Sequence, residues 1–188
     1  MRSLLVLFGL LTTSVAQAFA AGTDEEPFPG YMAECGFSIL FSPTLTVSQA
    51  VLAPNGRPMI ILDPSLAAEE ETAHRQFLIA HECAHHLMSH ARPEARMKRA
   101  KSKRVVRDQE MSADCWAAET LARKGMDRTL RIMSDRFFKS GLYSPGGGYP
   151  AGIQRSTIIL HCAETGRRDR AETLARIAAI ASAVPATF

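Results

Sequence analysis

The sequence predicts an α+β fold in which helices predominate, and two observations lead to that expectation. Residues 46–52 and 57–62 are short apolar segments, and the Pro-Asn-Gly run at 54–56 between them favours a tight hairpin turn. From Ser65 onward the strand pattern stops, and segments of helical composition follow. A small N-terminal antiparallel sheet followed by helices is therefore expected.

Each further element is bounded by residues that typically begin or end it. Residues 37–41 are a short apolar run and are expected to form another strand of the sheet. Pro93 and Gly125 each end a helical segment, and Asp127 is expected to cap the next one. Residues 142–152 form a loop rich in Gly and Pro. The predicted helices span 67–91 (one piece, or two that meet near residue 71), 105–124, 127–141, 153–164 and 169–184.

Length and composition indicate one globular domain behind an export signal. The 188 residues are 46% hydrophobic and 22% charged, which is ordinary for a folded domain. Residues 1–20 have a positive start, an apolar run, and small residues that allow cleavage after Ala18 or Ala20, so we expect a secretory signal peptide. Residues 21–188 then form the mature domain, periplasmic or extracellular, without an integral membrane span. An uncleaved N-terminal anchor is the alternative.

Four cysteines gain meaning from that expected export. In an oxidising compartment an even number of thiols permits two disulfides, and three pairings are open. A fully reduced, buried set is the alternative. The cysteines are Cys35, Cys83, Cys115 and Cys162.

The formal charge of +3 is concentrated in one basic run. This run, residues 92–107, links two predicted helices, and we interpret it as a solvated connector or helix face, with contact to an anionic surface as the alternative. It lacks the interleaved aromatic residues on which single-stranded nucleic acids stack, so we do not expect nucleic-acid binding.

A five-residue motif points to metal chemistry. His81-Glu82-Cys83-Ala84-His85 lies in an apolar, helix-compatible segment. On a helix the two histidines lie about 40° apart on one face, so both rings can bind one cation. Glu82 beside them is placed to take a proton from metal-bound water. Cys83, about 200° from His81, should point toward the protein body. Two histidines spaced by four without a metal are the alternative.

A zinc site in a hydrolase usually has three protein ligands and one water, so a third ligand is needed. Glu110 is the candidate, and Asp114, four residues later on the same helix face, can accept a hydrogen bond from a ligating imidazole. One Zn²⁺ per chain is expected. The alternative is a surface helix with two acidic residues near Arg107. We expect the other histidines to be non-ligands, namely His74, His86, His90 and His161.

Residues 78–86 (LIAHECAHH) together with 110–117 (EMSADCWA) resemble the gluzincin metallopeptidases, in particular soluble relatives of the CAAX prenyl endopeptidase family. The resemblance covers roughly residues 50–162. It implies a zincin-like fold, with strand 59–62 as an edge strand along which an extended peptide binds. It also implies site roles, with His81, His85 and Glu110 as ligands, Glu82 as general base, and Asp114 as a support for a ligand.

The chain departs from that family's pattern at one place. The family often has His-Pro followed by an Arg, whereas this sequence has Tyr149-Pro150 and Arg155. A tyrosine hydroxyl can donate to the oxyanion formed when water adds to an amide, so Tyr149 is a candidate catalytic residue. Arg155 is expected either to assist or to brace the loop.

The sequence thus predicts an exported zinc metalloendopeptidase acting on a peptide or protein substrate. The main alternative is an exported metal-binding scaffold or partner-binding protein without turnover, and a weaker one is a helical exported protein without metal. Substrate specificity depends on loops such as 142–152.

Overall fold

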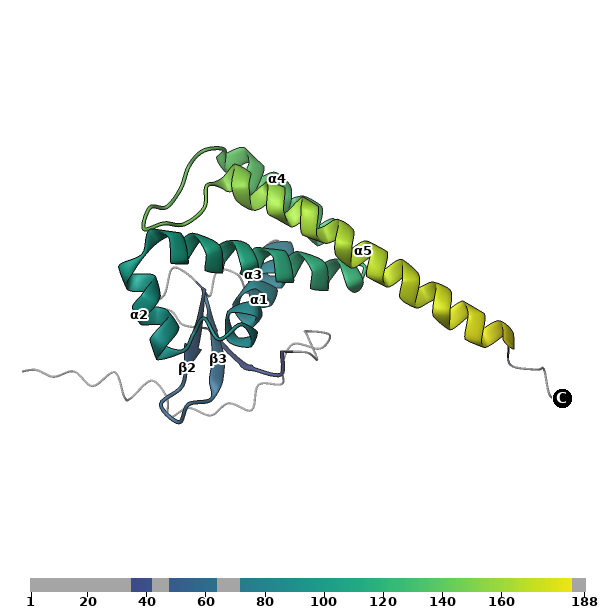
Figure 1. Cartoon of the computed structure of the whole chain (residues 1–188), viewed down its shortest axis with the longest axis horizontal. Coiled ribbons are helices and arrows are strands. Elements are labelled where there is room, and N and C mark those ends of the chain that lie inside the picture. The colour runs from purple at the N-terminus through teal and green to yellow at the C-terminus, as the bar shows by residue number, and fades with distance from the viewer. Residues whose placement is uncertain (1–34, 42–47, 64–71, 184–188) are drawn as a thin grey trace, which may run out of the picture.

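The computed structural model describes residues 35–41, 48–63 and 72–183, and it is mainly helical with one small sheet (Figure 1). The α+β prediction is therefore confirmed. The predicted signal peptide, residues 1–20, lies outside the described residues. The elements are β1 (Ser38–Phe41), β2 (Gln49–Leu52), β3 (Pro58–Leu62), α1 (Thr72–Leu87), α2 (Pro93–Lys101), α3 (Lys103–Arg123), α4 (Asp127–Ser140) and α5 (Gly152–Ala183).

The sheet is mixed, with strand order β1-β3-β2. β2 and β3 form the predicted antiparallel hairpin, in which the Gly56 N–H donates to the Ala53 carbonyl at 2.8 Å. β1 pairs with β3 in parallel, so the expectation of a wholly antiparallel sheet was wrong. The expectation of β3 as an edge strand was also wrong, because β3 is paired on both sides. Local patterns predict that strands exist, but their direction and order depend on the path of the whole chain.

The basic run, interpreted as a connector or a helix face, is helical on both sides of Ser102: residues 93–101 form α2, and residues 103–107 begin α3. Pro93 is the first residue of α2, where its missing N–H costs no hydrogen bond. Ser102 separates α2 from α3, and its hydroxyl accepts a hydrogen bond from the Val105 N–H at 3.3 Å. α2 buries none of its residues.

α5 is one continuous helix where two had been predicted. Gly166, which falls between the two predicted helices, lies inside α5 against α3. A Cβ at this position would be 2.3 Å from the Glu119 carbonyl oxygen, so the glycine permits close packing of the two helices. Beyond this contact, α5 projects from the rest of the molecule (Figure 1).

The core fixes the orientation of α1. Phe77 and Ile79 are almost fully buried, together with Ile60 and Leu62 of β3 and Leu121 of α3. Phe77 lies one turn before His81 on the same side of α1, with 6.4 Å between their ring centroids, and from this side His81 reaches α3. Two disulfides add covalent links, Cys35–Cys83 and Cys115–Cys162. Cys83 is fully buried and faces the protein body, as predicted.

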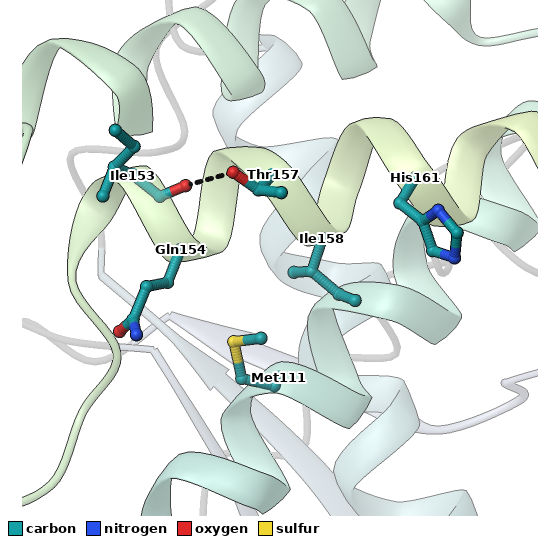
Figure 2. Close-up of a pocket in the computed structure, with 6 residues that line it drawn as sticks. All are labelled: Met111, Ile153, Gln154, Thr157, Ile158 and His161. Carbon is teal, nitrogen blue, oxygen red and sulfur yellow. Dashed lines mark hydrogen bonds between the residues drawn. The ribbon is translucent and has the colours of Figure 1, made fainter.

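A shallow apolar hollow lies between α3 and the first turns of α5 (Figure 2). Two of its polar side chains are engaged at the start of α5: the Thr157 hydroxyl donates to the Ile153 carbonyl, and Gln154 Oε1 accepts from the N–H of Ala151, just before α5. The hollow is lined by Met111, Ile153, Gln154, Thr157, Ile158 and His161. It is separate from the cleft described below. In the described part of the chain, no helix is long and apolar enough to cross a membrane.

Candidate metal centre

α1 presents His81, Glu82 and His85 as buried side chains, each less than 8% exposed. The histidines are one helical turn apart, and their Nε2 atoms lie 3.1 Å from each other. The predicted common face of the helix is therefore present, with both ring nitrogens directed to one point.

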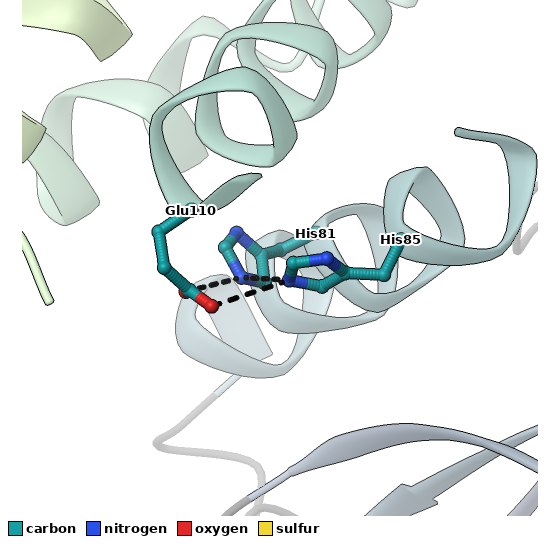
Figure 3. Close-up of side chains that lie close together, drawn as sticks. All are labelled: His81, His85 and Glu110. Carbon is teal, nitrogen blue, oxygen red and sulfur yellow. Dashed lines mark hydrogen bonds and ion pairs between the residues drawn. The ribbon is translucent and has the colours of Figure 1, made fainter. Parts of the chain in front are cut away.

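The carboxylate of Glu110, on α3, lies beside the two histidine rings (Figure 3). Its Oε2 lies 3.2 Å from His81 Nε2, and its Oε1 lies 3.6 Å from His85 Nε2. One potential ligand atom from each of the three residues falls within 4.8 Å of the others. The three residues predicted as ligands, which are far apart in the sequence, are therefore brought together.

The donor set suits a divalent ion of the zinc type. Two imidazole nitrogens and one carboxylate oxygen are a common three-ligand set for catalytic zinc, which leaves one coordination position for water. A second group of three, Cys115, Cys162 and Glu119, also lies close together among the described residues. Its two cysteines form a disulfide and so offer no thiolate. None of the four histidines expected to be non-ligands belongs to either group in the described residues.

Each histidine of the centre has a partner for its second ring nitrogen. His81 Nδ1 lies 2.8 Å from Asp114 Oδ1, and Asp114 is fully buried. Arg155 donates to both oxygens of Asp114, at 2.7 and 2.6 Å. Asp114 thus has the geometry expected of a residue that orients a ligand, and Arg155 braces Asp114.

His90 is the corresponding partner of His85, with 3.0 Å between their Nδ1 atoms. The end of α1 makes this contact possible. Ser89 adopts a left-handed conformation, with a φ of 62°, and the His90 N–H donates to the His85 carbonyl at 2.7 Å. This C-terminal turn folds His90 back over the helix. Burial lowers the pKa of His90, so its neutral ring can accept the Nδ1–H of His85.

The electrostatics of the metal-free cluster place one proton where a cation would bind. Burial opposes a charge on His81, but hydrogen bonds with Asp114 and Glu110 raise its pKa to about 10. Burial and the neighbouring His81 charge lower the pKa of His85 to about 3. Although burial opposes ionisation of Glu110, its contact with His81 keeps the pKa of this carboxyl below its usual value. The site therefore favours positive charge between its three side chains.

Glu82 is held beside the centre by the sheet. Its Oε2 accepts a hydrogen bond from the Ala50 N–H of β2 at 2.7 Å. Burial raises the pKa of Glu82 above the ordinary value. The edge strand that faces the site is therefore β2, and not the strand 59–62.

Arg99 of α2 is a site residue that the sequence did not predict. Its Nη2 donates to Glu110 Oε1 at 2.6 Å and to the Tyr149 hydroxyl at 2.8 Å. Tyr149 reaches this place because the loop before α5 approaches α3 closely. Gly148 has a φ of +101°, and a Cβ there would lie 2.4 Å from the Lys103 carbonyl oxygen. No sequence signal distinguished Arg99 from the other residues of the basic run.

These groups line one open cleft of about 870 Å³. Its walls come from β2, from all five helices and from the loop before α5, and the cleft is open, so the candidate centre is reached from solvent. Beside the residues already described, the cleft is lined by Ser48, Gln49, Asp63, His74, Leu78, Ala91, Arg96, Arg136 and Pro145.

Comparisons of the chain with protein-family models, with curated proteins and with solved structures found no match. The resemblance of the two motifs to gluzincins stays an expectation from the residues themselves.

Proposed function

We propose that this chain is an exported zinc metallopeptidase that hydrolyses peptide bonds with Glu82 as general base. The observation that carries the proposal is that His81, His85 and Glu110 converge in the same open cleft as Glu82. A purely structural zinc site is usually closed by four protein ligands, whereas here three ligands face a cleft. The two disulfides support an oxidising compartment.

The chemistry divides between the ion and the chain. Zinc bound to the three ligands would lower the pKa of water toward about 7 and polarise the scissile carbonyl. Glu82 takes the proton of the attacking water and passes it to the leaving amine. Its raised pKa makes it a stronger base than an exposed carboxylate. Asp114 and Arg155 hold the His81 ring in place during these steps.

Tyr149 is placed to donate a hydrogen bond to the carbonyl oxygen of the scissile peptide bond. Its hydroxyl oxygen accepts a hydrogen bond from Arg99, so its own hydrogen is available for donation. That hydrogen can stabilise the negative charge that develops on the substrate oxygen. We also place an extended substrate along β2, because this edge strand lines the cleft beside Glu82.

The substitution Glu82→Gln tests the proposal. This variant should keep about one zinc per chain but lose peptide hydrolysis by at least about 100-fold, because the amide cannot accept a proton. His81→Ala should lose both zinc and hydrolysis. Zinc content and turnover of a broad peptide library are measured on each protein, with a chelator and after zinc is restored.

Glu172→Gln provides a matched control, because Glu172 is exposed on α5 and does not line the cleft. It should leave zinc content and turnover at parent values. Hydrolysis by Glu82→Gln at the parent rate would refute the role of Glu82. A zinc-loaded parent protein that cleaves no peptide in the library would refute the peptidase and favour the metal-binding scaffold.

A further inference from the structure

The wall of the cleft formed by α2 is strongly basic. The helix carries four cationic side chains and a single acidic one, Glu94. This excess on nine residues equals the net charge of +3 of the whole chain. α2 buries none of its residues, and Arg99 links it to Gln109 and Glu110 of α3.

The cations of α2 do not all face the cleft. Arg96 and Arg99 line it, and their spacing of three places them on one face of the helix. Lys98 and Lys101 do not line the cleft. A substrate in the cleft therefore meets two arginines, while the lysines face elsewhere.

The two arginines differ in whether their guanidinium groups already have partners. Arg99 is occupied, since its guanidinium binds the Glu110 carboxylate and the Tyr149 hydroxyl. Arg96 is exposed at the rim, and within the part of the chain that the structure describes it forms no ion pair. Arg96 is thus a cation at the entrance of the cleft that is available to a ligand.

The ionised side chains of the cleft balance one another, and a bound metal ion would make the cleft positive. Four arginines line it, against the carboxylates of Asp63, Glu82 and Glu110. Arg155 is balanced by Asp114 behind it. A divalent cation at the centre would add two further positive charges, so an anionic group is attracted to the cleft and a cationic group is repelled.

We propose that the cleft selects peptides that carry a carboxylate near the scissile bond and that Arg96 binds this carboxylate. The inference rests on the proposed peptidase function and adds its substrate class. A guanidinium binds a carboxylate through two parallel N–H donors, which gives orientation as well as attraction. The carboxylate is either an acidic side chain or the C-terminus of a short peptide, and both have the same chemistry.

The first experiment compares fluorogenic peptides that differ only in this group. Two peptides carry either Glu or Gln at the positions that flank the scissile bond. Each of the two is made once with a free C-terminus and once with an amidated C-terminus. For the zinc-loaded full chain, kcat/KM should be roughly five-fold higher for the peptide with the carboxylate, the size of one partly exposed ion pair. The preference should shrink in high salt. If the higher kcat/KM follows the Glu side chain, Arg96 binds a side-chain carboxylate; if it follows the free C-terminus, Arg96 binds a terminal carboxylate.

Substitution at Arg96 assigns the preference to this residue. Arg96→Gln should bring the ratio of the two kcat/KM values close to one, and Arg96→Glu should invert it in favour of a peptide with Lys. Inversion cannot result from mere damage to the fold. Lys98→Glu is the matched control, since it makes the same charge change on the same helix outside the cleft, and its ratio should stay at the parent value.

Binding separates failure of this inference from failure of the peptidase. The affinity of Glu82→Gln for the same peptides is measured by fluorescence anisotropy. If the parent protein cleaves nothing but Glu82→Gln binds the Glu peptide more tightly, the function is wrong and the carboxylate site stands. If both peptides are cleaved and bound equally, the inference is wrong and the peptidase stands. Binding of each variant to anionic lipid vesicles is measured as well. If Arg96→Glu and Lys98→Glu lose vesicle binding equally and the parent protein shows no preference among the peptides, the carboxylate site is overturned in favour of a lipid-binding surface.

Discussion

The His81 ring lies between two carboxylates, with Glu110 at Nε2 and Asp114 at Nδ1. In the protein without metal, the proton on His81 Nε2 is donated to the Glu110 carboxylate. A cation that binds the same nitrogen must displace this proton. The centre therefore couples metal binding to pH through one histidine.

Metal affinity should rise with pH. Because the pKa of His81 is raised to about 10, its ring is protonated at pH 7 and must lose a proton before it can bind zinc. His85, with its pKa lowered to about 3, and Glu110, with its pKa lowered, have no proton to lose at that pH. Affinity should therefore increase about ten-fold per pH unit up to about pH 10.

Calorimetric titration with zinc in buffers of different ionisation enthalpy measures this proton. About one proton per chain should be released at pH 7. An observed enthalpy that does not depend on the buffer would show that His81 is already neutral, in contradiction to its raised pKa.

Single residues of the centre were predictable where a local pattern defines them. The spacing of His81 and His85 follows from helix periodicity, and the pair Glu110 and Asp114 follows from the same rule. Arg99 was not predictable, because its role arises from contacts with α3 and with the loop before α5.

At the scale of elements, α3 is the helix on which the site is assembled. It supplies Glu110 and Asp114, packs against α1, and contacts α5 along its other side. α3 and α5 approach closely at Gly166, and about three turns earlier on α5 Arg155 donates to Asp114 of α3.

Gly166→Ala should destabilise the protein, although alanine is the better helix former. The new Cβ would lie 2.3 Å from the Glu119 carbonyl and 2.8 Å from the Ala122 Cβ, so the helices must move apart. Overpacking of this kind typically costs about 1–3 kcal/mol. Chemical denaturation followed by circular dichroism measures the free energy of unfolding.

Ala175→Gly on the exposed part of α5 is the comparison. There alanine should be the preferred residue, by at most about 1 kcal/mol, because only helix propensity acts. If Gly166→Ala is as stable as the parent protein or more so, the close packing of α3 and α5 is not required.

At the scale of the whole molecule, the disulfides join the two site helices to distant parts of the chain. Cys83 follows Glu82 on α1 and is linked to Cys35, just before β1. Cys115 follows Asp114 on α3 and is linked to Cys162 on α5. Each bridge is thus adjacent in sequence to a residue of the candidate centre.

Removal of either disulfide by a double Cys→Ser substitution should lower the free energy of unfolding by up to about 4 kcal/mol, from the entropy of closing loops of this length. The two losses should be similar, because the bridges span 48 and 47 residues. Zinc affinity should also fall, since the site helices lose a restraint. Denaturation of both variants and of the reduced parent protein measures the effect, and unchanged stability after reduction would contradict it.

The sequence by itself determined the main helices, the β2–β3 hairpin and the set of side chains able to bind a metal. These depend on periodicity, turn residues and spacing, which are local properties of the chain. The tertiary structure decided that Glu110 meets the two histidines, that β1 runs parallel to β3, which cysteines pair, and that Arg96 and Arg99 line the cleft. Each of these depends on residues far apart in sequence, whose proximity results from packing of the whole core.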